Sequence, residues 1–175
     1  MQSHVVPLIG IVVATCLTNS WSEEPLVPLS MDFGSDGNPA VTYESFLDAP
    51  AGRDGFIRMK GERLVKPDGS RFRIWGVNVT GAGCFPSREM AGRMADDLAR
   101  MGINCVRFHG LDSVWGGSSI DYSRNDTLQF NDSDMDKFDF FVAELKKRGI
   151  YSNLNLNVFR RYKDGDGVRD ADKLG

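Results

Sequence analysis

The stretch Ile103-Asn104-Cys105-Val106-Arg107-Phe108-His109-Gly110-Leu111-Asp112 decides how this chain folds. It predicts a β-strand over 103–109, in which side chains alternate between two faces. Cys105, Arg107 and His109 share one face, and the valine and phenylalanine between them share the other, where they can pack against helices. An arginine and an imidazole at the carboxyl end of one strand favour a polar pocket, because neither group suits an apolar core without partners.

The segment before this strand predicts a helix over 87–101. Ser87 can cap this helix, and Gly102 follows it as a stop signal. Four apolar side chains recur at helical spacing and are predicted to face the core. They are Met90, Met94, Leu98 and Met101.

The segment after the strand predicts a polar loop over 112–131, a second helix over 133–148 and a third strand over 150–158. Asp136 is placed for a capping box at the start of the second helix. Gly149 marks the end of that helix.

A β-hairpin is predicted over 56–75. Residues 56–60 and 71–75 flank Pro67-Asp68-Gly69-Ser70, which is a turn sequence, and the second arm continues into a longer strand over 72–79. The order hairpin, strand, helix, strand, helix, strand is typical of an α/β fold with parallel strands. We expect the three strands to be parallel neighbours in chain order, with both helices on one side of them.

The composition excludes several classes of function. With 41% hydrophobic and 26% charged residues the chain has ordinary globular values. A net charge of −3 argues against a nucleic-acid partner. Three cysteines form no paired disulfide framework and fit no zinc spacing, and two histidines make a histidine-based metal site improbable. We therefore expect no metal.

The amino terminus predicts export. The apolar run over 5–17 is too short to span a bilayer and has the length of the hydrophobic core of a signal peptide, so residues 1–22 are predicted to be one. The protein would then be secreted or periplasmic. A weak lipoprotein-like sequence at Cys16 leaves lipid anchoring open, and a disordered start or a misassigned start codon is the alternative to export. Residues 23–54, rich in proline and glycine, predict an irregular lead-in.

Three segments together resemble a known family. They are Phe72-Arg73-Ile74-Trp75-Gly76-Val77-Asn78, Leu98-Ala99-Arg100-Met101-Gly102-Ile103-Asn104-Cys105-Val106-Arg107 and Leu145-Lys146-Lys147-Arg148-Gly149-Ile150-Tyr151. In order and spacing, residues 55–162 resemble the N-terminal third of a cellulase-like (β/α)8 glycoside hydrolase of clan A, close to family five in type. The resemblance implies that 55–175 form the first strands and helices of a TIM barrel, preceded by a hairpin.

The family resemblance also implies a function. Such enzymes cleave O-glycosidic bonds of polysaccharides or oligosaccharides by a retaining mechanism with two glutamates, at the ends of strands four and seven, and need no cofactor. Both glutamates would lie beyond Gly175, so this chain alone is expected to be inactive. A complete small α/β domain is the alternative to a fragment. A non-catalytic carbohydrate-binding protein on a degenerate barrel, or an unrelated serine hydrolase, is the alternative function. No Gly-x-Ser-x-Gly elbow supports the latter.

Arg107 matches the family's arginine at the end of strand two, which hydrogen-bonds the nucleophilic carboxylate. The alternative is a buried arginine paired with a core carboxylate. His109 can bind a sugar hydroxyl or orient the partner of Arg107, or it is a hydrogen-bonded loop histidine. Asn78 ends the first strand, where a hydrogen-bonding role is expected.

Asn153, Asn155 and Asn157 share one face of the predicted third strand. Three amides on one face are unfavourable in an apolar core, so they are expected to face a polar barrel interior. Asn157 would be nearest the mouth, where many relatives carry a histidine. An amide can bind a hydroxyl there but cannot titrate.

Trp115 and Tyr122 lie in the 112–131 loop and are candidates for stacking on a sugar ring, or else anchors for their own loop. Arg160 and Arg161 are predicted to be solvated loop residues. Asp164, Asp166 and Asp170 alternate with glycines but lack the remaining ligands of a calcium loop.

Overall fold

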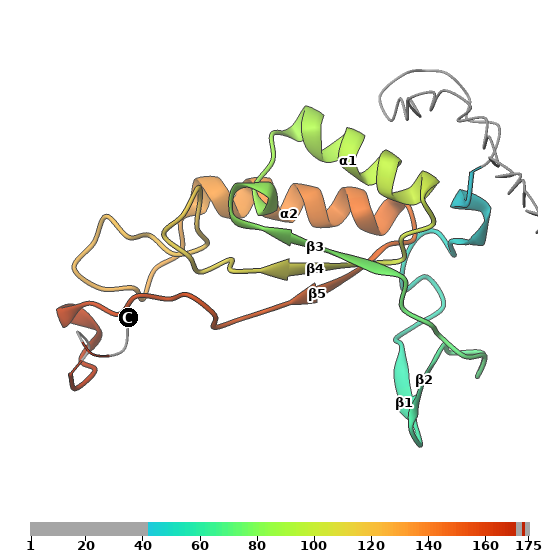
Figure 1. Cartoon of the computed structure of the whole chain (residues 1–175), viewed down its shortest axis with the longest axis horizontal. Helices are drawn as coiled ribbons and strands as arrows, with labels where there is room; N and C mark the ends of the chain where they lie inside the picture. The colour runs from blue at the N-terminus through green and yellow to red at the C-terminus, as the bar shows by residue number, and fades with distance from the viewer. Residues whose placement is uncertain (1–41, 171–172, 174–175) are drawn as a thin grey trace, which may run out of the picture. The chain divides into compact units, whose positions relative to one another are not determined.

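A computed structural model describes residues 42–170 and residue 173 (Figure 1). The signal-peptide segment, Cys16 and residues 23–41 of the lead-in lie outside the described residues. The elements, in chain order, are η1 (Glu44–Phe46), β1 (Arg58–Lys60), β2 (Arg63–Val65), β3 (Gly76–Thr80), η2 (Gly81–Cys84), α1 (Arg88–Arg100), β4 (Cys105–His109), α2 (Asp132–Lys147), β5 (Tyr151–Leu154) and η3 (Asp164–Asp166).

The central sheet is parallel and has the order β3-β4-β5. Val77 pairs with Val106, and Val106 pairs with Ser152. Both α1 and α2 lie on one side of this sheet, and the other face is open (Figure 1). The predicted α/β class, the parallel chain-order neighbours and the common side of the two helices are therefore confirmed. The described residues form an open three-stranded sheet and not a closed barrel.

The core lies between the sheet and the two helices. Phe108 of β4 is fully buried and lies nearly perpendicular to the rings of Phe138 and Phe141, with ring centroids 5.0 and 5.7 Å away. Leu145 and Ile150 are also buried there. The alternation in the 103–109 stretch thus directs Val106 and Phe108 to the helices, as predicted.

The inner face of α1 is a row of alanines rather than the predicted methionines. Ala91, Ala95 and Ala99 are at most 1% exposed, whereas Met90 and Met101 are 44% and 38% exposed. Small side chains four residues apart let a helix backbone approach its neighbours closely, so the bulkier side chains are displaced to the flanks. The prediction that the methionine stripe faces the core was wrong at these two positions. Met94 and Leu98 do pack partly against the core.

The helix caps confirm one prediction and correct another. The Ser87 side chain accepts a hydrogen bond from the backbone N–H of Met90 at 3.2 Å, as expected of a cap. In α2 the cap is Asn131, whose side chain accepts from the N–H of Asp134. Asp136 makes no capping box, because it lies beyond the first turn and pairs with Arg88 of α1 at 3.0 Å.

The hairpin has a different register from the predicted one. β1 pairs with β2, so the tight turn lies at Gly61 and Glu62. The turn at 67–70 exists, with the Ser70 N–H donating to the Asp68 side chain at 2.8 Å, but it joins β2 to an isolated bridge between Val65 and Arg71. Gly61 has a positive φ of 59°, which glycine adopts easily, and this allows the tight turn between β1 and β2. The sequence did not reveal the turn at Gly61, because Pro67-Asp68-Gly69 is the stronger turn sequence.

The strands are shorter than predicted. In the predicted strand 72–79, hydrogen bonds to a side chain replace part of the backbone pairing between strands. The Asn104 amide accepts from the backbone N–H of Trp75 at 2.8 Å and donates to the Arg73 carbonyl at 2.7 Å. Residues 72–75 therefore run to β3 outside the regular sheet. At the other edge, β5 ends at Leu154 rather than at 158.

The described part of the chain contains no helix that is both long enough and apolar enough to cross a membrane.

Candidate functional site

A polar row crosses the open face of the sheet. The register places Asn78, Arg107 and Asn153 side by side on three adjacent strands, and all three are exposed. The Nε of Arg107 donates to the side-chain oxygen of Asn155 at 2.9 Å. Three of these side chains, Asn78, Arg107 and Asn153, line a groove of about 450 Å³ that continues along Ile74 and Trp75.

Arg107 is held by an amide and not by a carboxylate. In the described part of the chain its side-chain partner is Asn155, which uses one of the five guanidinium donors. The exposed position speaks against a buried arginine paired with a core acid. The remaining donors are available to an anionic or hydroxylic group above the open face.

The predicted row of three amides is only partly formed. Asn153 belongs to β5, and Asn155 follows it and reaches Arg107. Asn157 lies beyond the strand end and is exposed. The chain leaves the sheet after Leu154, so the period-two argument does not extend to 157.

A buried carboxylate joins the loops that follow β4 and β5. Asp112 is 3% exposed, and its two oxygens accept from the backbone N–H groups of Val158 at 2.8 Å and Phe159 at 3.1 Å. Sequence reasoning missed this residue. Its position directly after the β4 motif was the available signal, because side chains that follow parallel strands gather at one edge.

Asp112 places Phe159 beside two of the predicted site residues. The Phe159 ring lies 5.4 Å from His109, nearly perpendicular to it, and 5.2 Å from Trp115. The Nδ1 atom of His109 is buried and has no hydrogen-bond partner among the described residues. The structure thus brings His109 and Trp115 together through a phenylalanine that the sequence did not single out.

Gly110 is required for this arrangement. Its φ is +73°, and a Cβ added there would lie 2.9 Å from Cδ2 of Phe159. Gly167 provides a matched comparison, because its φ is +67° and nothing lies within 4 Å of an added Cβ.

We expect Gly167→Ala to lower the free energy of unfolding by about 1–2 kcal/mol, the strain of a left-handed residue with a side chain. Gly110→Ala should cost about 1–3 kcal/mol more, because it adds an overlap with the Phe159 ring. Urea denaturation of both variants measures the difference. Equal losses would mean that the ring of Phe159 moves aside freely.

Tyr122 anchors its loop. Its hydroxyl donates to the Asp112 carbonyl at 2.7 Å and accepts from the Arg161 N–H at 3.1 Å. Burial raises the pKa of this phenol, so it stays protonated and can keep donating. Lys163 adds a second tie by donating to the carbonyl of Tyr122.

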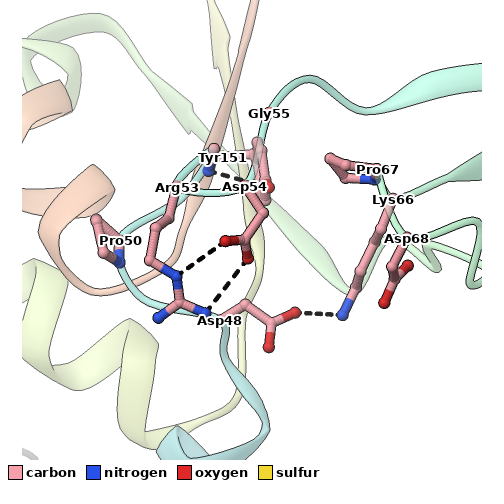
Figure 2. Close-up of a pocket in the computed structure, with 10 residues that line it drawn as sticks. Asp48, Pro50, Arg53, Asp54, Gly55, Lys66, Pro67, Asp68 and Tyr151 are labelled. Atoms are coloured by element: carbon pink, nitrogen blue, oxygen red, sulfur yellow. Dashed lines mark hydrogen bonds and ion pairs between the residues drawn. The ribbon is translucent and has the colours of Figure 1, made fainter.

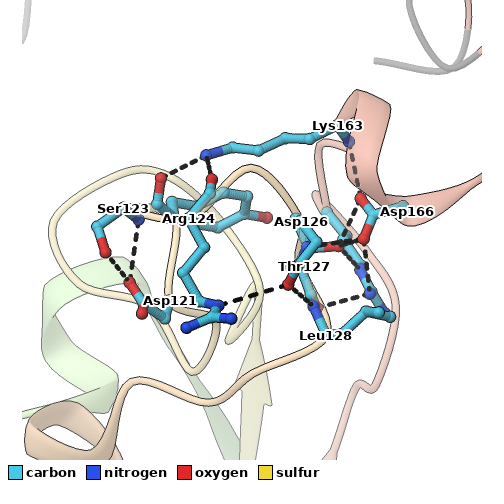
Figure 3. Close-up of polar contacts among 10 residues, drawn as sticks. Asp121, Ser123, Arg124, Asp126, Thr127, Leu128, Lys163 and Asp166 are labelled. Carbon is cyan, nitrogen blue, oxygen red and sulfur yellow. Dashed lines mark hydrogen bonds and ion pairs between the residues drawn. The ribbon is translucent and has the colours of Figure 1, made fainter.

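A second buried carboxylate, that of Asp166, joins the 112–131 loop to the segment after β5 (Figure 3). The Asp166 side chain is 2% exposed and accepts from the Thr127 N–H at 2.7 Å, from the Thr127 hydroxyl and from the Lys163 N–H. Arg160 donates to the Thr127 hydroxyl at 2.8 Å and to its carbonyl at 2.7 Å. The prediction that Arg160 is a solvated loop residue was wrong, because the side chain is tied into this network.

The Asp166 network predicts a response to acid. Burial raises the pKa of the Asp166 carboxyl, but hydrogen bonds from Lys163 and Thr127, aided by the positive charge of Arg160, outweigh it, and the net pKa is lowered. A lowered folded-state pKa means that the stabilisation is present above the unfolded pKa and is lost as the pH falls through the folded one.

We therefore expect the 160–167 loop to open below about pH 4, near and below the ordinary aspartate pKa. Cleavage of this loop by pepsin in acid and by trypsin at neutral pH measures the opening. Asp166→Asn should leave the loop open at neutral pH as well, with no acid step. An acid step that persists unchanged in Asp166→Asn would contradict the assignment.

A pocket of about 280 Å³ lies at the amino-terminal end of β5 (Figure 2). Its charges are paired internally, Lys66 with Asp48 and Arg53 with Asp54. The Tyr151 hydroxyl accepts from the Gly52 N–H at 3.1 Å. These contacts connect the lead-in to the hairpin and the sheet. We therefore interpret the pocket as a structural feature and not as a binding site.

The described residues contain no group of three or more side chains placed to hold a metal ion. Cys84 is buried without a disulfide, and burial raises the pKa of its thiol to about 11, so it is no candidate nucleophile at neutral pH.

Comparison with known proteins found no family model, no curated protein and no solved structure that matches the chain.

Proposed function

We propose that this chain forms the first three strands of the TIM barrel of a secreted, retaining glycoside hydrolase that acts on β-linked polysaccharides or oligosaccharides. The observation that carries the proposal is the polar row of Asn78, Arg107 and Asn153 across the open face of a parallel sheet.

The two faces of the sheet support this proposal. Each strand of a (β/α)8 barrel turns one face to the surrounding helices and the other to the barrel interior. Here Val77, Val106 and Phe108 face α1 and α2, and the amides and guanidinium face the open side. Such donors suit sugar hydroxyls and a catalytic carboxylate.

The chemistry proposed for the site is a double displacement. The first carboxylate attacks the anomeric carbon while the second protonates the leaving oxygen. The second carboxylate then acts as a base and activates the water that releases the sugar. The two carboxylates of such enzymes lie about 5 Å apart. Arg107 would donate to the nucleophile and keep it ionised. The proposal assigns the two carboxylates to barrel strands that would follow Gly175, and it assigns export to the 1–22 segment.

The full-length gene product that contains these residues tests the proposal. It should hydrolyse β-linked tetrasaccharides built from glucose, mannose or xylose, and proton NMR should detect the β-anomer as the first product. An α-anomer as first product would overturn the retaining mechanism. Binding of an oligosaccharide without hydrolysis would favour the non-catalytic carbohydrate-binding protein, and neither binding nor hydrolysis would remove the carbohydrate assignment.

A further inference from the structure

Two large aromatic side chains are exposed together at the carboxyl ends of β4 and β5. Trp115 is 58% exposed and Phe159 is 40% exposed, and their ring centroids are 5.2 Å apart. They come from different loops, after β4 and after β5. Exposed aromatic surface is unfavourable in water, so an adjacent pair from two loops indicates a surface that a ligand covers.

The pair is held in place by contacts in its own loops. The backbone N–H of Phe159 is fixed on Asp112, and its ring lies against Gly110. The loop of Trp115 is positioned by Gly116, at which a Cβ would lie 3.1 Å from that of Ala82. A platform whose parts are already ordered loses little conformational entropy on binding.

A polar group adjoins the aromatic pair. His109 is half-buried, and its ring lies 5.4 Å from that of Phe159 and nearly perpendicular to it. A pyranose with equatorial hydroxyls combines an apolar C–H face with a rim of donors and acceptors. The planes of the Trp115 and Phe159 rings are inclined by 46°, so each ring offers its own apolar face to such a sugar, and the imidazole beside them is the polar group.

We propose that Trp115 and Phe159 form a stacking platform for a pyranose unit with equatorial hydroxyls, with the imidazole of His109 beside Phe159. The sugar class rests on the proposed function, whereas the platform itself rests on the contacts above. Asp112 is a positioning residue, because it acts by fixing Phe159.

The test uses the full-length gene product and a panel of tetrasaccharides that are β-1,4-linked and built from glucose, xylose or mannose. Phe159→Leu keeps an apolar side chain and removes the flat ring, and Trp115→Leu does the same for the indole. Phe56→Leu is the matched control, because Phe56 is 82% exposed and precedes β1, away from the carboxyl ends of β4 and β5. Calorimetric titration gives the Kd of each variant.

We expect Phe159→Leu and Trp115→Leu each to weaken binding of the preferred tetrasaccharide by about tenfold, on the scale of one lost aromatic contact. Phe56→Leu should leave the Kd unchanged. The glucose or xylose oligomer should bind more tightly than the mannose oligomer, whose axial hydroxyl interrupts one face.

The outcomes separate this inference from the proposed function. Hydrolysis of a tetrasaccharide with unchanged Kd values in both platform variants would overturn the platform and leave the glycosidase proposal standing. Platform-dependent binding without hydrolysis would support the platform and overturn the glycosidase. If no tetrasaccharide binds, both fall. A loss of binding shared by Phe56→Leu would also overturn the platform.

Discussion

Substituting Arg107 by alanine is expected to lower the turnover number of the full-length enzyme by about 100-fold or more, the scale of one lost preorganised donor in an active site. Arg107 lies on the open face of β4, and its Nε is held by Asn155. Under the proposed function its remaining donors meet the nucleophilic carboxylate. Without them, the carboxylate pKa rises and the group is held less well for attack.

Two further substitutions separate charge from geometry at this position. Arg107→Lys should restore part of the activity, because it keeps the positive charge and loses the planar fork. His109→Ala should reduce turnover less, since its proposed role is to bind substrate. Arg58→Ala, at an exposed position in β1, is the control and should have no effect.

Steady-state kinetics over a range of pH, on variants whose fold is verified by circular dichroism, gives the answer. In Arg107→Ala the acidic limb of the kcat profile should move to higher pH, which a merely structural arginine would not cause. Near-normal turnover with an unmoved profile would make Arg107 structural and remove the strongest residue-level support for the family.

The sequence predicted those features that depend on local periodicity. The alternation in 103–109 assigned Val106 and Phe108 to the helix side and Arg107 to the opposite face, and the structure has the same division. Side-chain period and a Ser87 cap are local properties, so neighbouring residues suffice to reveal them.

The features that were missed depend on partners far along the chain. Asp112 binds residues 46 and 47 positions later, and Asp166 binds Thr127 across 39 positions. A single aspartate in a loop carries no mark of such contacts. The same holds for the alanine row of α1, because its burial depends on how closely the helix approaches its neighbours.

Both buried aspartates connect the loops that follow β4 and β5. Asp112 links the β4 loop to Phe159, and Asp166 links the 112–131 loop to the segment after Arg160. Each carboxylate accepts hydrogen bonds from two backbone N–H groups, and Asp166 also accepts from the Thr127 hydroxyl and lies 4.0 Å from Arg160. These contacts offset the desolvation of the carboxylates and hold the loops. The aromatic pair is thereby attached to the strand ends and not to a free loop.

The largest loss of stability is expected for Phe108→Ala. Phe108 is fully buried between β4 and α2, and it lies nearly perpendicular to both Phe138 and Phe141. Removing the ring loses its transfer free energy and leaves a cavity, because these two rings are held by their own helix. We expect the free energy of unfolding to fall by about 3–5 kcal/mol.

A loss of this size is a large share of the about 5–15 kcal/mol that stabilises a typical domain. Phe56→Ala is the matched control, because Phe56 is 82% exposed, and it should change stability by less than about 0.5 kcal/mol. Urea denaturation followed by far-ultraviolet circular dichroism compares the two. Similar small losses for both would place Phe108 outside the core, and the β4 alternation on which the orientation of Arg107 depends would be wrong as well.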